Sequence, residues 1–153
     1  MSEVDTLSLI LAMDERGIAP SEVETRREAL VPLGAAMLDV AEPAYHRLSQ
    51  WRARNALVYT AIKFARRYPA ARQLGATALS DKSDAVRSTA CALLAFGLDR
   101  ESIPALETLA ARDCRSAEDA EAAIRAIRAG NHHLYMDRRN TGRVRWNVLG
   151  APE

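Results

Sequence analysis

The chain has 153 residues, about the size of one domain, and 48% of them are hydrophobic while only 5% are aromatic. This composition favours closely packed helices and argues against a β-sandwich. The formal net charge of +1 indicates no class of partner by itself.

The beginning of the chain lacks the features of an export signal. Acidic residues stand where a signal peptide would be basic, and Asp14 and Glu15 interrupt a short apolar run. Cys91 and Cys114 are far apart and form no CxxC pair, so we expect reduced, apolar side chains and no zinc. These features predict a cytoplasmic protein that does not enter a membrane.

Charge is distributed unevenly along the chain. Residues 1–42 carry nine acidic and three basic residues, a sum of −6. Residues 43–79 carry seven basic residues and no acid, a sum of +7. This division predicts either one basic patch on the surface or two segments that neutralise each other in the fold.

The acidic segment 1–42 is predicted to form N-terminal helices. Pro20 is followed by Ser21 and Glu24 in the spacing of a capping box, which predicts the start of a long helix. Pro32 would lie inside this helix and kink or divide it.

Proline and glycine mark the helix boundaries in residues 44–130. We place three prolines in first turns or just before helices, namely Pro43, Pro69 and Pro104. Gly97 and Gly130 are expected at helix ends. These marks predict five helices of about 12 to 20 residues.

The same region is periodic. Shifting the sequence against itself by 32 to 33 residues aligns Arg54 with Arg87, Asp81 with Asp113, and Gly97 with Gly130. A period of this length is typical of a repeated helix pair.

The segment Ser80–Asp113 resembles a HEAT-like (armadillo-type) repeat. It has an Asp-containing turn, Val-Arg at the start of one helix, a seam of Ala and Leu that ends at Gly97, and Pro104 in the first turn of the next helix. The resemblance covers about residues 52–130. It implies an all-α, right-handed helical solenoid within a single domain of residues 1–153, with the N-terminal helices covering one end.

Residues 131–148 alternate between apolar and polar side chains, which predicts a C-terminal β-hairpin. Gly142 would take the left-handed position of its loop. The apolar face, with Met136 and Trp146, would cover the last helix. The polar face would carry His133, Tyr135, Asp137, Arg143 and Arg145.

Two sets of residues are candidates for binding a partner: the basic stretch 45–72, where aromatic residues lie among the charges, and the polar face of the hairpin. The candidates are Arg47, Trp51, Arg52, Arg54, Lys63, Arg66, Arg67, His133, Tyr135, Arg143 and Arg145.

The sequence predicts no catalytic residue, cofactor or metal site. His132 and His133 would lie on opposite faces of a strand, and no glycine-rich phosphate loop or nucleophile motif occurs. An enzyme that acts through His133 and Asp137 is the rival hypothesis.

Nucleic-acid binding through the 45–72 face is the alternative. A basic HEAT-like surface with an aromatic residue resembles the alkylpurine DNA glycosylases of this architecture. The chain departs from that family because it is shorter, nearly neutral, and without a dependable catalytic aspartate.

The function that the sequence predicts is therefore non-enzymatic protein binding, with an acidic patch on the partner facing the basic residues. The chain also resembles the bacterial immunity proteins that block a cognate toxin, some of which use helical-repeat folds. An inhibitor of this kind and an adaptor are both consistent with the predicted architecture.

Overall fold

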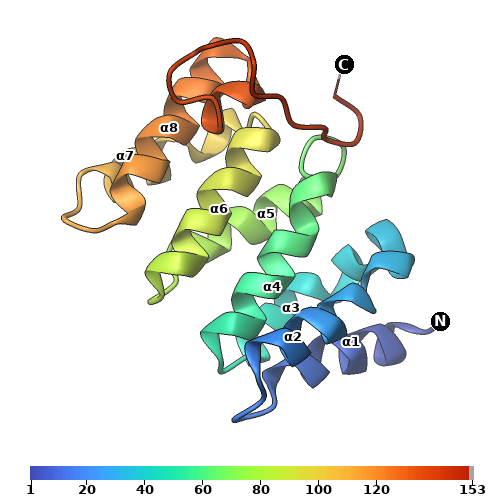
Figure 1. The fold of residues 1–153 in the computed structure, drawn as a ribbon. Helices are drawn as coiled ribbons and strands as arrows, with labels where there is room; N and C mark the ends of the chain where they lie inside the picture. The colour runs from blue at the N-terminus through green and yellow to red at the C-terminus, as the bar shows by residue number, and fades with distance from the viewer. Residues whose placement is uncertain (152–153) are drawn as a thin grey trace.

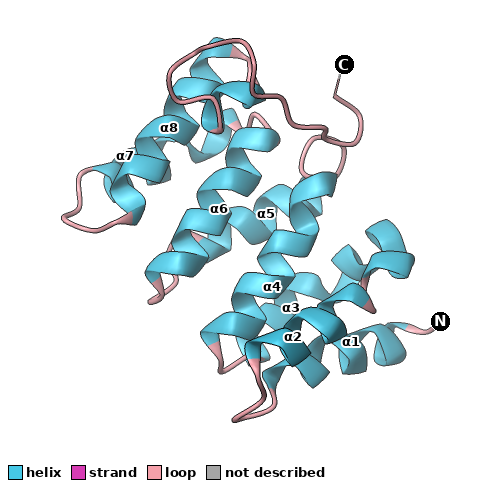
Figure 2. Ribbon diagram, viewed as in Figure 1, coloured by secondary structure: helices cyan, strands magenta, loops and turns pink. Residues whose placement is uncertain are grey.

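A computed structural model describes residues 1–151 of the chain (Figure 1). This part is all-helical, which confirms the predicted all-α class (Figure 2). Its α-helices are α1 (Glu3–Leu11), α2 (Pro20–Glu28), α3 (Leu38–Arg47), α4 (Trp51–Ala61), α5 (Pro69–Ala78), α6 (Asp84–Phe96), α7 (Ile103–Ala110) and α8 (Ser116–Ala129). Its 3-10 helices are η1 (Ala12–Asp14), η2 (Val31–Met37), η3 (Ile62–Phe64), η4 (Arg100–Ser102) and η5 (His132–Tyr135).

The α-helices form two layers. In one layer α2, α4, α6 and α8 lie side by side, and α1, α3 and α5 pack in the other (Figure 1). Most helices therefore pack on the helix two places along the chain as well as on a direct neighbour. The core between them is apolar, and its fully buried side chains include Leu57, Leu74, Leu93, Leu106 and Ile127. None of the helices within residues 1–151 combines the length and apolar character needed to cross a bilayer.

The long helix predicted from Pro20 onwards is instead three elements. The helix α2 has Pro20 in its first turn and ends at Glu28, and Pro32 is the second residue of the separate 3-10 helix η2. Gly34 in η2 has a φ of 58°, which breaks the helical path before α3. The prediction for Pro43 was also wrong, because this proline lies inside α3, where its ring replaces a backbone donor.

The boundaries predicted from the other prolines and glycines are correct. Pro69 and Pro104 lie in the first turns of α5 and α7, and Gly97 and Gly130 follow the last residues of α6 and α8. Five helices follow α3, as predicted, but they are shorter than expected, with 8 to 14 residues. Much of the predicted length belongs to η3 and η4, where the helices tighten at their ends.

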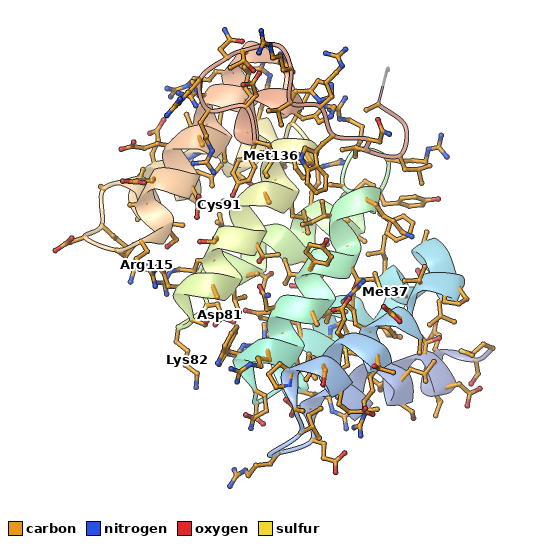
Figure 3. The ribbon with its side chains drawn as sticks, in the orientation of Figure 1. Met37, Asp81, Lys82, Cys91, Arg115 and Met136 are labelled. Atoms are coloured by element: carbon orange, nitrogen blue, oxygen red, sulfur yellow. The ribbon has the colours of Figure 1, made fainter. Side chains whose placement is uncertain are left out.

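Arg54 and Arg87 stand at the fourth positions of α4 and α6 and make corresponding hydrogen bonds. Each guanidinium donates to a backbone carbonyl six residues earlier, at 3.2 Å to Leu48 and at 2.7 Å to Asp81. Arg54 also donates to the Asp81 carboxylate at 2.7 Å, and Arg87 donates to the Ser116 hydroxyl at 3.2 Å. One bonding pattern thus joins α4 to the turn before α6, where Figure 3 labels Asp81, and α6 to the start of α8.

The predicted β-hairpin of residues 131–148 is wrong. Its first part forms the 3-10 helix η5, and no strand occurs within residues 1–151. The expected faces are also wrong, because Tyr135 and Asp137 of the polar set are buried while Met136 and Val144 of the apolar set are exposed. The segment still packs against the end of the fold, with η5 in contact with α6 and α8.

Side chains take the backbone groups that a β-ladder would need. The Asp137 carboxylate accepts the backbone N–H groups of Thr141 and Gly142 at 2.9 and 2.8 Å, which closes a tight loop. Gly142 is left-handed in this loop, with a φ of 74°, but the loop joins no strands. The N–H and carbonyl of Trp146 bond to two histidine rings, so that residue cannot pair with a neighbouring strand.

Candidate functional site

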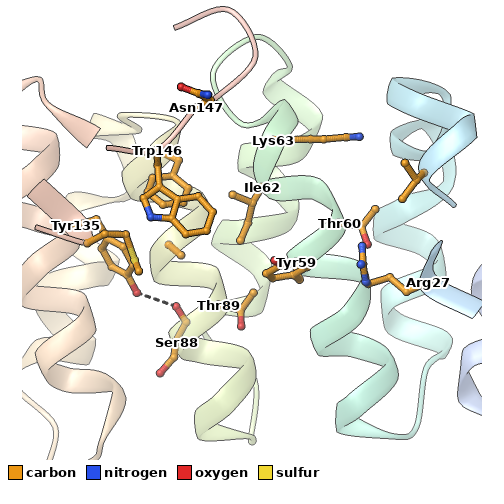
Figure 4. Close-up of a pocket in the computed structure, with 14 residues that line it drawn as sticks. Arg27, Tyr59, Thr60, Ile62, Lys63, Ser88, Thr89, Tyr135, Trp146 and Asn147 are labelled. Atoms are coloured by element: carbon orange, nitrogen blue, oxygen red, sulfur yellow. Dashed lines mark hydrogen bonds between the residues drawn. The ribbon is translucent and has the colours of Figure 1, made fainter. Parts of the chain in front are cut away.

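A groove of about 450 Å³ opens on the face formed by α2, α4 and α6 (Figure 4). Arg27 of α2 and Tyr59 of α4 line one side of it, and Tyr135 and Met136 line the other. The C-terminal segment completes the far wall with Trp146. The groove thus depends on residues that are far apart in sequence and that the two-layer packing brings together.

The floor of the groove is formed by short side chains of α6. Ser88 and Ala92 lie one helical turn apart on the same face, beside Thr89. These side chains leave room between the taller aromatic walls, as Figure 4 shows for Ser88 and Thr89. The Thr89 hydroxyl lies 2.6 Å from the Asn55 side-chain oxygen, and this hydrogen bond ties α6 to α4 beneath the groove.

The walls expose large apolar side chains to solvent. Tyr59 is 51% exposed, Met136 is 42% exposed and Trp146 is 40% exposed. The Trp146 ring stacks on Phe96 of α6, with 5.7 Å between the ring centroids and 23° between the planes. The groove therefore exposes apolar surface at fixed positions, which is typical of a binding site.

Two histidines fix the position of Trp146. His132 Nε2 lies 2.7 Å from the Trp146 carbonyl oxygen, and the Trp146 N–H donates to His133 Nδ1 at 2.9 Å. Arg66 lies 3.0 Å from His132 Nδ1 and can only donate, so Nδ1 accepts and Nε2 carries the proton. Both imidazoles are therefore in their neutral form in this arrangement.

The surroundings of both imidazoles favour that neutral form. Burial lowers the pKa of His132, and the nearby His133, Arg66 and Arg145 lower it further, against a smaller opposing effect of the bond to Trp146. Burial also lowers the pKa of His133, together with the positive charges of Arg145 and Arg66. Neutral pH thus keeps the wall that Trp146 forms in place.

A second hollow of about 350 Å³ adjoins the groove at Arg27 and Tyr59, which line both. It extends along α4 to Trp51 and Arg52, with Asn55 between them and Tyr59. We call the two hollows together the α4 groove. Its course follows the exposed face of α4 from the first turn to the last and on to η3.

Three cations of the α4 groove lie over aromatic rings. The distances from the charged atom to the ring centroid are 5.2 Å for Arg27 over Tyr59, 4.7 Å for Arg52 over Trp51 and 5.0 Å for Lys63 over Phe64. Arg27 also forms an ion pair with Glu24. Within residues 1–151, Arg52 and Lys63 have no carboxylate partner, so each end of the α4 groove carries a positive charge that is free to bind.

The structure brings four of the predicted binding residues together in the α4 groove: Trp51, Arg52, Lys63 and Tyr135. The other seven do not line it. They are Arg47, Arg54, Arg66, Arg67, His133, Arg143 and Arg145.

Those seven residues differ in their environment. Arg54 is buried in its pair with Asp81, and Arg66 donates to the Phe96 carbonyl at 3.2 Å in addition to His132, so both are structural. His133 fixes Trp146 from behind the wall. The other four arginines are exposed elsewhere on the surface.

Sequence reasoning missed most of the groove, above all Tyr59, Trp146 and the floor residues of α6. Trp51, Asn55 and Tyr59 are spaced at four-residue intervals, so they share one face of α4. This spacing could have predicted the groove along α4. For Ser88 and Ala92 no signal existed, because short residues on a helix are equally typical of a buried face.

The acidic and basic segments do not neutralise each other through ion pairs. Within residues 1–151, no ion pair joins an acid of segment 1–42 to a base of segment 43–79. Arg26 instead pairs with Glu15 and Glu22, and Arg27 pairs with Glu24, all inside the N-terminal segment. Arg52 of α4 and Lys63 of η3 therefore remain available at the surface, whereas Arg54 of α4 is buried.

No family model, curated protein or solved structure matches the chain. Across residues 1–151, no three His, Cys, Asp or Glu side chains are grouped as metal ligands. His132 and His133 have ring centroids 4.0 Å apart, and each uses a ring nitrogen to hold Trp146. What the described residues offer at the groove is thus apolar contact, hydrogen bonds and positive charge.

Proposed function

We propose that the chain is a non-enzymatic, HEAT-like helical-repeat module that binds another protein in the α4 groove. The observation that carries this proposal is the pair of exposed aromatic walls, Tyr59 and Trp146, on either side of the low floor of α6. Aromatic residues, methionine and arginine are enriched in protein interfaces, and Met136 and Arg27 complete the same surface.

The two-layer stacking supports a solenoid of the HEAT-like kind. Helices two places apart pack side by side, and the bonds of Arg54 and Arg87 recur in consecutive helices of one layer. A rigid stacked scaffold holds a groove open without a ligand, which reduces the entropy lost on binding.

Within this function we propose that the chain acts in the cytoplasm as an inhibitor or an adaptor, the inhibitor of a toxin included. Both roles need a preformed surface for one partner and no chemical step. The side chains at the α4 groove support a binding role without a chemical step. Its cations lie over aromatic rings, and the two histidines behind it are bonded to the backbone of Trp146.

Nucleic-acid binding is the second candidate, and the stacking of Arg52 on the exposed Trp51 favours it. Against it, the positive charge is small. Of the seven basic residues in 43–79, Arg54, Arg66 and Arg72 are bonded to protein groups, and the α4 groove itself contains only three cations. Strong binding to phosphates needs many such charges.

Affinity capture tests the proposed function. The immobilised chain is exposed to lysate of its source cells, alongside the groove variant Tyr59→Ala and the control variant Arg100→Ala, whose side chain is exposed outside the groove. We expect a protein that is captured by the wild type and by Arg100→Ala and lost with Tyr59→Ala. Equal capture by all three forms would show that the groove is not the binding site, and capture abolished by nuclease would favour nucleic acid.

A further inference from the structure

We propose that the α4 groove binds an acidic segment of its partner in extended form. One large apolar side chain of the segment would insert between Tyr59 and Trp146, and carboxylates on either side of it would bind Lys63 and Arg52. This inference rests on the proposed function and adds the chemistry of the occupant.

The anchor position follows from the exposed walls. Tyr59 and Trp146 offer ring surface (Figure 4), and Ala92 adds apolar area to the floor. A side chain that covers this surface removes apolar area from water on both molecules, which favours binding. An aromatic or long aliphatic side chain supplies the most area for one inserted group.

The charges follow from the two ends of the groove. Lys63 lines the end near Trp146, and Arg52 lines the opposite end beside Trp51. Neither has a carboxylate partner within residues 1–151. The one acid that lines the groove, Glu24, is already paired with Arg27, so the unpaired charge is positive and complements carboxylates.

The spacing of the carboxylates follows from the helix. Arg52 and Lys63 are 11 residues apart along α4 and η3, which corresponds to roughly 16 Å at the rise of an α-helix. An extended chain covers that distance in about five residues. The occupant would therefore carry its acids about four to six residues apart, with the apolar anchor between them.

The groove also presents a donor between these charges, about one helical turn from Arg52. Asn55 accepts the Thr89 hydroxyl through its side-chain oxygen, so its amide N–H groups are not needed for that bond. A backbone carbonyl of an extended segment has no partner inside its own chain and can accept from such an amide. Bases of a nucleic acid would gain from the aromatic rings as well, but two free cations neutralise few phosphates.

Selection from a displayed library of random 12-residue peptides tests the proposal. Peptides are selected on the wild-type chain and counter-selected on Tyr59→Ser, whose fold is checked by circular dichroism. We expect the enriched peptides to share an aromatic or long aliphatic residue with Asp or Glu on both sides. Their affinity should fall roughly tenfold or more in Arg52→Glu/Lys63→Glu and should be unchanged in the matched surface control Arg100→Glu/Arg112→Glu.

Each of the other possible results of the selection would refute one or both of the two proposals. Enriched peptides that depend on Tyr59 but are neutral or basic would refute the acidic occupant and leave protein binding in place. If counter-selection on Tyr59→Ser removes every peptide that was selected on the wild type, binding does not depend on Tyr59, and the groove is refuted as the site of both proposals. Random single-stranded DNA or RNA 20-mers that bind more tightly than the peptides, and lose affinity in the double charge variant, would refute both in favour of nucleic acid.

Discussion

The imidazole of His132 donates a 2.7 Å hydrogen bond to the backbone carbonyl of Trp146, which joins η5 to the residue that forms a wall of the groove. His133 accepts the N–H of the same residue at 2.9 Å. The second bond needs a neutral imidazole, because a proton on His133 Nδ1 would face the Trp146 N–H. A proton on His132 Nδ1 would face the Arg66 guanidinium, which lies 3.0 Å away, although Nε2 could still donate to the Trp146 carbonyl. The shape of the α4 groove is therefore linked to the protonation of two adjacent side chains.

Acidification should release Trp146 before the rest of the fold changes. The pKa of each imidazole is lowered in the folded chain, so the unfolded chain binds more protons between the two pKa values and stability falls as pH falls. The stabilisation is complete above the unfolded value of about 6.5 and is lost as pH passes below it through the folded value. In a Trp51→Phe background, Trp146 is the single tryptophan, and its fluorescence should shift to the red over this interval.

The third histidine provides the control. His46→Gln should keep the transition, because His46 is exposed and lies in α3, away from Trp146. Burial raises the pKa of Asp81, but its hydrogen bonds to Arg54, Tyr45 and Ser83 together lower it, and the backbone N–H of Thr141 lowers the pKa of Asp137. Both carboxylates therefore affect stability only at pH values near or below about 4, in a separate interval. A transition that vanishes in His46→Gln, or a spectrum that stays unchanged from about pH 7.5 down to the pH at which the whole fold is lost, would contradict the linkage.

Tyr135 should contribute more to the stability of the fold than Trp146 does. Tyr135 is buried against Phe96 and donates to the Ser88 carbonyl at 3.2 Å, so Tyr135→Ala should lower the free energy of unfolding by about 3–5 kcal/mol. Trp146 is 40% exposed, so Trp146→Ala should cost less, about 1–2 kcal/mol. Urea unfolding measures both values. If Trp146→Ala is the more damaging of the two, this segment is held by the indole ring rather than by η5.

The helices could be predicted from sequence because their boundaries are local. Pro69 and Pro104 fit only a first turn, and Gly130 ends α8 in the left-handed conformation that suits glycine. Pro43 could not be placed in this way, because α3 continues through it with the support of tertiary packing. Propensity is a weak guide where packing decides.

The C-terminal segment could not be predicted from alternation alone. The pattern of Leu134, Met136 and Trp146 satisfies a strand, but the bonds that decide its course involve side chains on backbone groups, such as the Asp137 carboxylate on Thr141 and Gly142. The groove was missed for a related reason. Trp146 meets Phe96 across 50 residues, and no periodicity within one helix encodes that contact.

The ion pair of Arg54 and Asp81 should be essential to the stacking of α4 on α6. Both side chains are buried, so Arg54→Met leaves the Asp81 carboxylate buried without its cation and should destabilise the fold by about 3–5 kcal/mol. Adding Asp81→Asn should recover part of this loss because no charge is then left buried. The adjacent control Arg52→Met should stay within about 0.5 kcal/mol of the wild type in thermal unfolding. A loss as large in Arg52→Met would contradict the assignment of Arg54 as structural and Arg52 as free.

The loop closed by Asp137 should protect the arginines that follow it from trypsin. Its carboxylate accepts the N–H groups of Thr141 and Gly142 and the Thr141 hydroxyl, which holds residues 138–142 in one tight turn. Asp137→Ala removes all three bonds, and the freed chain fits a protease more readily, so cleavage after Arg138 or Arg139 should become several-fold faster. The matched control is Asp113→Ala, which removes an exposed acid from the turn before α8. Mass spectrometry of the digest over time identifies the sites, and equal rates in the two variants would mean that the loop is ordered by something other than Asp137.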